Sequence, residues 1–340
     1  MSITKIALST GLSVSTVSNY LNHPDKVSKS SKAIIKAAMK KHNWRPDICR
    51  RGPKSQQRKG VRTGNIVLLS MTRYSPREMA RMPFLSMIYS SIQSELNQRQ
   101  FSMTLIGLEA DGNVPARITS QFCDGVILLG RPSAGTHKIY TALKGLPMVW
   151  CYRDHSDFLY QMDHILYDNS VVGAIAADYL FRREHRRVAV LNANLQHEAY
   201  SERVASFVEA SKSQGMTTSV IEYGELKSKY PDVESFRWLT DRLYECGGEE
   251  ITGAFFCSDD IMLGVYNELR FRNGKEPWLD MIGCNADENM MRFFEKRPAS
   301  IDIKLDDIGR TTVEQLLRRV NGNSSCCTEI YIKPELRSGD

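Results

Sequence analysis

The chain has 340 residues, of which 42% are hydrophobic and 25% are charged. At roughly 100–200 residues per domain, this length predicts two or three domains, and the composition argues against a disordered or collagen-like chain. No apolar run approaches the roughly 18 residues of a membrane span, and the polar N-terminus lacks the apolar core of a secretory signal. We therefore expect a cytoplasmic protein that does not bind a membrane.

The cysteines and histidines give no sign of a metal or a disulfide framework. The eight cysteines are scattered along the chain, and the seven histidines form no cluster with metal-ligand spacing. This pattern favours reduced thiols, several of them in apolar strands, and predicts neither a metal nor a cofactor.

Positive charge is concentrated at the N-terminus. Residues 1–62 contain 14 Lys and Arg but two Asp, a net charge of +12, whereas the rest contains 31 basic and 37 acidic residues, a net charge of −6. A small basic region joined to a mildly acidic body is typical of a protein that binds a polyanion. Charge alone leaves open a solvated basic tail.

The basic region begins with a predicted short helix, because four residues share one helical face: Ile3, Ile6, Ala7 and Thr10. Gly11 is the natural break after it, since glycine tolerates the positive φ of a tight turn. Ser13 is then the expected N-cap of a second helix over about residues 14–21.

The second helix has an apolar and a polar face. Its inward residues are predicted to be Val14, Val17 and Leu21. Its outward residues are predicted to be Ser15, Thr16, Ser18 and Asn19. After a loop, Ser28 can cap a third helix, Lys29–His42, whose expected core residues are Ile34, Ile35, Ala38 and Met39. This arrangement predicts a helix-turn-helix module that reads DNA with short polar side chains, although generic three-helix packing remains the alternative.

The residues of this head also resemble a known family. The run ITKIALSTGLSVSTVSNYLN from Ile3 to Asn22, the pair Val27-Ser28 and the segment Trp44-Arg45-Pro46 are similar to the headpiece of LacI/GalR-type bacterial transcription regulators. The resemblance implies that major-groove bases face Val14, Ser15 and Asn19. It implies that backbone phosphates contact Thr16, Ser18, Asn22 and Ser28. Asn19 replaces the usual Arg, and because Asn suits adenine, the operator sequence can differ from the family's common half-site.

The linker departs from the family pattern. Relatives form a hinge helix here and insert a Leu into the minor groove, but that Leu falls on Pro53, after Gly52, and Gly-Pro disfavours a helix. The stretch is instead basic, and we hypothesise that Arg50 and Arg51 enter the minor groove. A disordered charged linker that adds salt-dependent affinity is the equal alternative.

From Gly64 onwards, strands and helices alternate. The predicted strands are 66–71, 102–107, 126–129, 148–152, 187–192, 219–223, 254–257 and 281–284. The predicted helices are 84–98, 137–143, 172–182, 202–214, 233–246, 261–273 and 308–320. About eight buried strands separated by helices predict an α/β body of two lobes, each a doubly wound parallel sheet.

The body resembles the periplasmic-binding-protein-like effector domain of the same family. Among the carrying motifs are Asp124-Gly125, Asp168-Asn169 and Ser201-Glu202-Arg203. The resemblance implies a headpiece over 1–46, a basic linker over 47–63 and an effector and dimerisation domain over 64–340. One lobe would hold about 64–168 and 298–320, the other about 169–297 and the C-terminal segment, with three chain crossings between them.

Pocket residues follow from the same resemblance, position by position. The candidates are Arg203, Asn285, Phe84, Trp150, Tyr152, Ser258, Asp168 and Tyr74. Asn285 stands where the family usually has Asp, and Ser258 replaces an Asn. Trp150 and Phe84 can equally be plain core residues, and Arg203 can equally form a structural ion pair. Lost acidic positions weaken an ordinary sugar ligand, and Arg73, Arg77 and Arg81 near the expected cleft mouth suggest an anionic one.

These features together predict a ligand-responsive transcriptional regulator, most simply a repressor. Its expected partners are double-stranded operator DNA, a sugar-like small-molecule effector and a second copy in a homodimer, since no C-terminal heptad run indicates a tetramer. A solute-binding receptor of the same fold is the alternative, but it would have a signal peptide and no basic head. No phosphate loop, dinucleotide fingerprint or metalloprotease motif occurs, so we expect no enzyme activity.

Overall fold

The computed structural model describes residues 3–22, 24–42, 60–71, 79, 82–109, 111–130, 136–152, 162–195, 197–224, 231–322 and 326–339. The chain divides into two compact units, residues 1–58 and 59–340. We call them the head and the body. The predicted contacts Arg50 and Arg51, the Gly52-Pro53 pair and the candidates Tyr74, Arg73, Arg77 and Arg81 lie outside the described residues.

The head is a three-helix unit, as predicted. Its elements are α1 (Ile3–Thr10), α2 (Val14–Asn22), η1 (Pro24–Lys26) and α3 (Lys29–Lys41). Gly11 has φ +66° and makes the turn between α1 and α2. A small core closes the unit and consists of Ile6, Ala7, Val17, Ile35 and Ala38.

Two expected core residues of the head are not in the core. Val14 is 47% exposed and Ile34 is 46% exposed, so the prediction that they pack inward is wrong. Val14 is the first residue of α2 and Ile34 adjoins the buried Ile35 on α3, and three short helices enclose room for few side chains. For Val14, exposure agrees with the base-facing position that the family resemblance implies.

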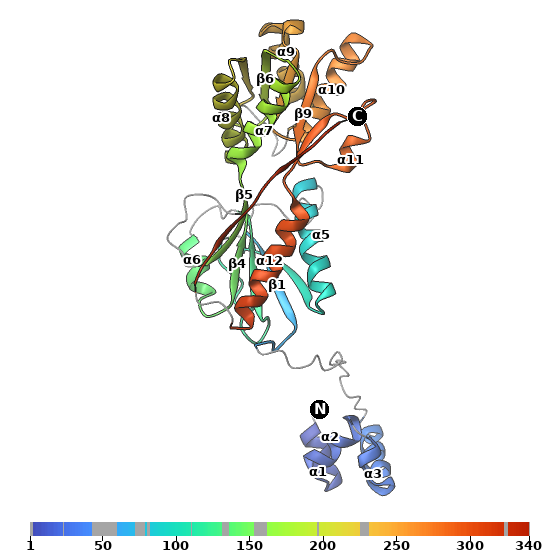
Figure 1. Cartoon of the computed structure of the whole chain (residues 1–340). Helices are drawn as coiled ribbons and strands as arrows, with labels where there is room; N and C mark the ends of the chain where they lie inside the picture. Colours follow the sequence, from blue (N-terminus) through green and yellow to red (C-terminus); the bar gives the residue numbers. More distant parts are fainter. Residues whose placement is uncertain are drawn as a thin grey trace. The chain divides into compact units, whose positions relative to one another are not determined.

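The body contains two six-stranded sheets (Figure 1). The first has the order β11-β5-β4-β3-β1-β2, and the second has the order β12-β10-β9-β8-β6-β7. The strands of the first are β1 (Asn65–Ser70), β2 (Ser102–Gly107), β3 (Gly125–Leu129), β4 (Met148–Cys151), β5 (Asp163–Tyr167) and β11 (Glu329–Ile332). Those of the second are β6 (Arg187–Asn192), β7 (Thr217–Glu222), β8 (Gly253–Phe256), β9 (Asp280–Cys284), β10 (Ala299–Asp302) and β12 (Glu335–Arg337).

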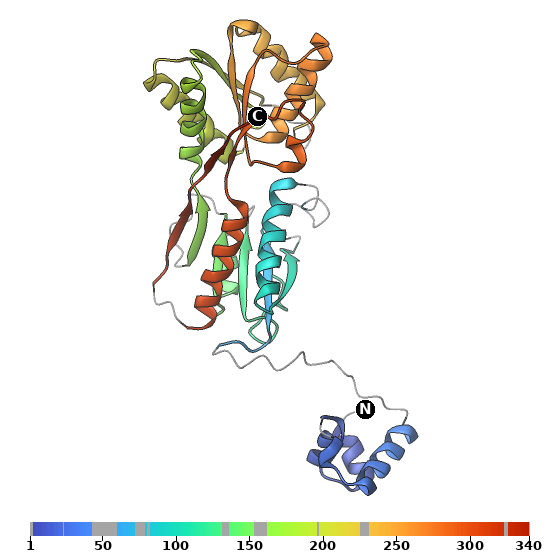
Figure 2. The ribbon, with the colours of Figure 1, turned by 45° about the vertical axis from the view of Figure 1, so that its right-hand side comes forward.

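Helices cover both sheets, as the alternating pattern predicts. The helices of the first lobe are α5 (Pro83–Gln98), α6 (Thr136–Ala142) and α12 (Leu305–Val320). Those of the second lobe are α7 (Asn169–Arg182), α8 (Glu198–Ser213), α9 (Val233–Glu245), η2 (Gly248–Glu250), α10 (Asp259–Asn273) and α11 (Glu288–Met291). All five residues of β3 are buried, as expected for a central parallel strand covered on both faces. Figures 1 and 2 show α5 and α12 side by side on the first lobe.

The described chain crosses between the lobes at three places, as the resemblance implies. The crossings are β5 to α7, β10 to α12 and β11 to β12. The expected crossing near 298 lies instead after Asp302, because β10 belongs to the second sheet. Likewise, β11 belongs to the first sheet, so the C-terminal segment serves both lobes.

Four of the twelve described strands were not predicted: β5, β10, β11 and β12. Charged or polar residues interrupt all four, which hides them from a search for continuous apolar runs. Asp163 opens β5 although it is fully buried, because Arg319 of α12 pairs with it at 2.6 Å. β12 also departs from the predicted parallel sheets, since it pairs antiparallel with β10.

Candidate nucleic-acid interface and ligand cleft

The α2 helix presents a short polar face away from the head core. Ser13 caps it, because its hydroxyl accepts the Thr16 backbone N–H at 3.1 Å and its carbonyl accepts that of Val17 at 3.2 Å. Val17 is completely buried and fixes the rotation of the helix. Val14, Ser15 and Asn19 are consequently exposed and free to approach another surface.

The residues predicted to contact phosphates differ from the base-facing residues in exposure and in structural role. Thr16 and Ser18 are half-buried, and the Thr16 hydroxyl lies 2.8 Å from that of Ser13. Ser28 caps α3, accepting the Ser31 backbone N–H at 3.2 Å. Asn22 ends α2, but its side chain lies outside the described residues.

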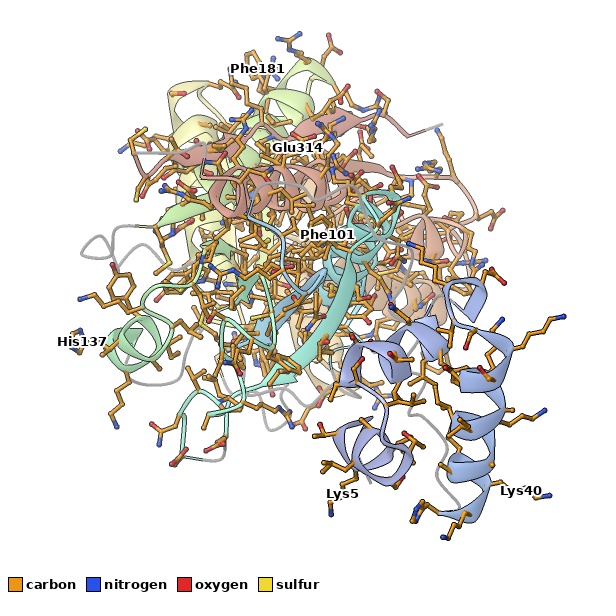
Figure 3. The ribbon with its side chains drawn as sticks, turned by 90° about the horizontal axis from the view of Figure 1, so that it is seen from below. Lys5, Lys40, Phe101, His137, Phe181 and Glu314 are labelled. Carbon is orange, nitrogen blue, oxygen red and sulfur yellow. The ribbon has the colours of Figure 1, made fainter. Side chains whose placement is uncertain are left out.

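The third helix supplies most of the charge in the described head. α3 carries five lysines and no acid: Lys29, Lys32, Lys36, Lys40 and Lys41. Lys40 on this helix and Lys5 on α1 extend outward from the three-helix unit (Figure 3). Such a surface attracts a polyanion over a Debye length of about 8–10 Å at physiological salt.

The body site is built around Arg203, which lies in the first half of α8 and is 2% exposed. Its Nε donates to Asn169 Oδ1 at 2.9 Å, and one terminal nitrogen donates to the Cys257 carbonyl oxygen at the end of β8. The other terminal nitrogen donates to the Tyr167 hydroxyl at 3.1 Å, at the end of β5. Arg203 therefore joins the two lobes where the carboxyl ends of parallel strands meet, the usual ligand position in open α/β sheets.

Aromatic rings form the wall beside Arg203. Its guanidinium carbon lies 5.7 Å from the ring centre of Tyr167 and 5.6 Å from that of Tyr200. On the first lobe, Tyr152 stacks on Tyr167 with ring centres 5.7 Å apart, and Phe84 meets Tyr152 edge-on at 5.1 Å. The predicted residues Phe84 and Tyr152 thus stand together beside the predicted Arg203.

The tyrosines of this wall remain protonated. Burial raises the pKa of Tyr152 well above its ordinary value, and burial also raises the pKa values of Tyr167 and Tyr200. Each phenol is therefore a neutral hydroxyl that can both donate and accept a hydrogen bond.

Asn285 follows β9 and has an unusual backbone. Its φ is +113°, and its buried Oδ1 has no hydrogen-bond partner among the described residues. Ser258, which precedes α10, is 1% exposed and donates to Asp260. Asp168 caps α7 by accepting the Ser170 backbone N–H at 2.9 Å. Asn285 therefore has a free acceptor, whereas Ser258 and Asp168 already have structural partners.

The remaining described candidate, Trp150, is a core residue. It is completely buried in β4, and its Nε1–H donates to the Gly130 carbonyl at 2.8 Å. This geometry favours the core alternative over ring stacking on a ligand.

Sequence reasoning missed three residues that surround Arg203: Tyr167, Asn169 and Tyr200. Tyr167 and Asn169 flank the predicted Asp168 at the carboxyl end of β5, and this position at a strand end is the signal that could have identified them. It was not used because β5 was not recognised as a strand. Tyr200 lies three residues before Arg203, a spacing that places both on one helical face.

The adjacent acids Asp259 and Asp260 do not form an exposed carboxylate pair. Asp259 Oδ1 accepts the Ser300 hydroxyl at 2.7 Å, and Oδ2 accepts the Asp287 backbone N–H at 2.8 Å. Burial raises the pKa of Asp259 to about 8. Asp259 thus holds β10 and the start of α11 against α10 inside the second lobe.

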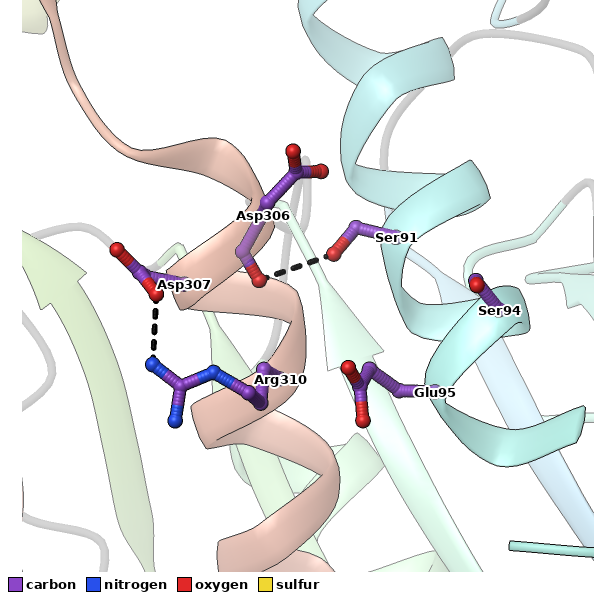
Figure 4. A pocket seen from close by; sticks show the side chains of 6 residues that line it. All are labelled: Ser91, Ser94, Glu95, Asp306, Asp307 and Arg310. Atoms are coloured by element: carbon purple, nitrogen blue, oxygen red, sulfur yellow. Dashed lines mark hydrogen bonds and ion pairs between the residues drawn. The ribbon is translucent and has the colours of Figure 1, made fainter. Parts of the chain in front are cut away.

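A separate shallow pocket of about 260 Å³ lies between α5 and α12 (Figure 4). Within it, Ser91 donates to the Asp306 carbonyl at 3.1 Å, and Arg310 donates to Asp307 at 2.6 Å. Ser91 is thus paired with Asp306, and Arg310 with Asp307. None of the predicted site residues is among those that line this pocket. In the described part of the chain, no group of three metal-ligating side chains occurs, and no helix is long and apolar enough to cross a membrane.

Comparisons with known proteins agree with this two-part organisation. Residues 2–47 match the family described as bacterial regulatory proteins, lacI family, and residues 177–340 match the periplasmic binding protein-like domain. The HTH-type transcriptional regulator CelR of Thermobifida fusca is 23% identical over 341 residues, covering 97% of this chain and 95% of that protein.

Two solved structures have the same fold over the whole chain. A transcriptional regulator CelR-cellobiose complex has a TM-score of 0.65 at 22% identity and covers 100% of this chain and 99% of its own. The lac repressor dimer bound to operator and the anti-inducer ONPF has a TM-score of 0.68 at 16% identity and covers 100% and 98%. At these identities, the likeness shows the fold of the head and the fold of the two-lobed body.

Proposed function

This chain belongs to the lacI family of bacterial regulatory proteins, and from that premise we propose that it is a dimeric repressor controlled by a small ligand in the cleft beside Arg203. It is a DNA-binding transcriptional regulator. The observation that carries the proposal is the exposed polar face of α2 on a head rich in lysine.

Val14, Ser15 and Asn19 are proposed to read bases in the major groove. They are exposed on the helix that Ser13 caps and Val17 anchors, so their short side chains can approach base edges. Thr16, Ser18, Asn22 and Ser28 are proposed to contact phosphates, together with the α3 lysines, which add salt-dependent affinity.

The cleft is proposed to change the relation of the lobes when a ligand binds. Arg203 of the second lobe donates to Tyr167 of the first, so a ligand that competes for this contact acts on both lobes. The path to the head begins on the first lobe, where the Asp124 carboxylate accepts the backbone N–H groups of Arg62 at 2.8 Å and Gly64 at 2.6 Å. Movement of that lobe therefore moves the C-terminal end of the linker.

Dimerisation is proposed to cover exposed apolar surface on the second lobe. Phe271, in α10, is 83% exposed, and Phe293, just after α11, is 60% exposed. Contiguous exposed apolar surface favours a protein interface, and the proposal takes both rings as part of such a surface. A two-fold dimer also places two recognition helices about one turn of DNA apart, and the lac repressor structure is a dimer on its operator.

No catalytic role is proposed. The family consists of regulatory proteins. Among the described residues, Asp259 is buried and Asp168 caps α7, so neither offers a free exposed carboxylate beside Arg203.

The test is selection of binding sites from a random duplex pool by the full-length chain at moderate ionic strength. We expect enrichment of two half-sites related by a dyad. Asn19→Ala should then weaken binding to the selected site by about 10- to 100-fold, with a relaxed preference at one base pair and unchanged non-specific affinity.

The matched control is Lys36→Ala, an exposed α3 lysine that faces no base in the proposal. It should weaken specific and non-specific binding alike and lower the salt slope by about one unit. Absence of any enriched sequence would overturn the proposal, and so would equal behaviour of the two variants.

A further inference from the structure

Two adjacent cysteines, Cys326 and Cys327, lie between α12 and β11. Both are exposed, and neither forms a disulfide in the described structure. Among the other described cysteines, Cys246 is exposed directly after α9, and the rest are buried. No other two cysteines are adjacent in the sequence. Cys326 and Cys327, which we call the dithiol, therefore offer two thiols at once to one small molecule from solvent.

Polar contacts hold the backbone on both sides of the dithiol. Arg319, in the last turn of α12, donates to the Cys326 carbonyl oxygen and to both oxygens of Asp163. Directly after the dithiol, the Thr328 backbone N–H donates to Asp163 Oδ1 at 2.8 Å, and its carbonyl accepts the His164 backbone N–H at 2.9 Å. The dithiol thus lies on an anchored segment, which lowers the entropic cost of binding one ligand through both sulfurs.

The dithiol is poorly placed for a disulfide bond between its own two members. Adjacent Cα atoms lie about 3.8 Å apart across a trans peptide bond. Disulfide-bonded cysteines usually have Cα atoms about 4.4–6.8 Å apart. A third atom between the two sulfurs lengthens the bridge and removes this conflict. The spacing therefore favours binding of one soft atom by both sulfurs over their direct oxidation to a disulfide.

The surroundings of the dithiol supply too few ligands for a structural zinc ion. Such an ion takes four protein ligands, whereas no group of three metal-ligating side chains occurs in the part of the chain that the structure describes. A trivalent arsenic atom that already carries one carbon substituent needs two further bonds. Because thiolates are soft ligands that prefer soft atoms, the dithiol can supply both of these bonds.

We propose that the dithiol is a binding site for a monosubstituted trivalent arsenical. Each S–H bond is replaced by an S–As bond, and each hydroxyl group on arsenic leaves as water with the proton of one thiol. Arsenic remains trivalent, so the step needs neither an oxidant nor a reductant. The site lies outside the ligand cleft and is a second chemical input to the protein.

The dithiol is connected to the linker through the end of α12. The Cys327 side chain interacts with the Arg319 guanidinium. Val320 follows Arg319, and Gly60 of the linker packs so closely on it that an added Cβ would lie 1.9 Å from the Val320 carbonyl oxygen. Drawing both sulfurs onto one arsenic atom disturbs the contacts of Arg319 and so loosens the helix end against which the linker packs. We expect weaker DNA binding as a consequence, which rests on the proposed function.

The test of the site uses the reduced full-length chain in oxygen-free buffer with phenylarsonous acid. Intact-mass spectrometry should show one phenylarsenic group per chain. Excess mercaptoethanol, a monothiol, should leave this group in place, whereas ethanedithiol should remove it, because a ligand with two thiols competes far better than one with a single thiol. Graded ethanedithiol competition then measures the affinity.

The variants Cys326→Ser and Cys327→Ser each leave a single thiol and should lower the affinity for the arsenical by about 100-fold or more. Cys246→Ser removes an exposed thiol that has no adjacent cysteine, so it should keep the affinity and is the matched control. Capture that resists mercaptoethanol in either dithiol variant would overturn the site, and so would its loss in Cys246→Ser.

Duplex binding tests the connection to the linker. With a duplex selected as described above, the arsenical-loaded wild type should bind about 10-fold more weakly than the unloaded chain. Cys327→Ser should bind the duplex equally with and without the arsenical. Equal affinity of the loaded and unloaded wild type would overturn the connection. Failure of the unloaded chain to select any duplex would instead count against the proposed function, while arsenical capture by itself decides the site.

Discussion

The two lobes of the body have the same strand order but supply different chemistry to the cleft. In each sheet, a residue of positive φ directly follows the fourth strand in chain order. Tyr152 follows β4 with a φ of +61°, and Asn285 follows β9 with a φ of +113°. Both residues donate a backbone hydrogen bond to the next strand, Tyr152 to Ile165 at 3.0 Å and Asn285 to Ile301 at 2.9 Å. The backbones correspond, while one side chain is an aromatic ring and the other an amide.

This difference shows that the two lobes contribute different kinds of side chain to the proposed ligand site. The first lobe contributes rings that offer area for packing, namely Phe84, Tyr152 and Tyr167. The second lobe contributes polar groups, of which Arg203 and Asn285 have hydrogen-bonding capacity that no described residue uses. Under the proposed function, a ligand that contacts both lobes favours one relation of the lobes over another, which links ligand binding to lobe position.

In the first lobe, a buried ion pair joins β5 to α12, and Asp163→Asn is the variant with the largest expected effect. Asp163 is completely buried in β5, where Arg319 donates to both of its oxygens at 2.6 and 2.7 Å and the Thr328 backbone N–H donates at 2.8 Å. Removing one charge of a buried pair should lower the free energy of unfolding by about 3 kcal/mol. Urea unfolding measures it, and Asp178→Asn in an exposed pair is the control, with a change within about 0.5 kcal/mol.

The dependence of unfolding free energy on pH gives a second test of the Asp163–Arg319 ion pair. Burial by itself raises the pKa of Asp163, but hydrogen bonds from Arg319 and Thr328 outweigh it and hold the pKa below its ordinary value. The stabilisation is therefore present above the ordinary carboxyl pKa and is lost as the pH falls through the lowered pKa of the folded state. The difference in unfolding free energy between the wild type and Asp163→Asn should become smaller below about pH 4. A difference that stays constant with pH would argue against the ion pair as its cause.

Tyr152→Gly is expected to have the next largest effect. Glycine relieves the strain of φ +61°, but the ring that packs on Phe84 and Tyr167 is lost. Loss of packing should prevail, with a fall of about 2 kcal/mol in unfolding free energy and weaker binding of any ligand that stabilises the wild type. Tyr152→Phe, which keeps the ring, should restore most of the stability. An unchanged Tm in Tyr152→Gly would mean that the ring wall contributes little.

Much of the architecture could be predicted from the sequence, because apolar runs and helix caps are local signals. Ser13 and Ser28 cap α2 and α3 as expected, and the β2 and β6 bounds, Ser102–Gly107 and Arg187–Asn192, are those predicted. The strands that were missed depend on distant partners. Asp163 can begin a buried strand because Arg319, 156 residues later in the chain, neutralises it.

The candidate site likewise contains residues that the sequence predicted and residues that it did not. Arg203, Phe84 and Tyr152 were predicted from a family pattern, and the structure brings them together. Tyr167 was missed because its place beside the guanidinium follows from the packing of the two lobes, whereas Tyr200 lies three residues before Arg203 on α8, a local spacing that was not used. Trp150 belongs to the same pattern but lies in the core, since its strand turns alternate side chains to opposite faces.

The smallest effect, and one of opposite sign, is expected for Asn285→Gly at the position that corresponds to Tyr152. Asn285 has a φ of +113° and a buried side-chain oxygen without a partner among the described residues, so replacement by glycine relieves strain and removes an unsatisfied acceptor. The free energy of unfolding without ligand should rise by about 1 kcal/mol. Affinity for the proposed effector should fall at the same time, because Asn285 is one of the proposed contact residues. Thermal unfolding with and without ligand measures both changes. A variant less stable than the wild type would mean that Asn285 supports the fold, and the contrast between the two strand ends would then be one of packing alone.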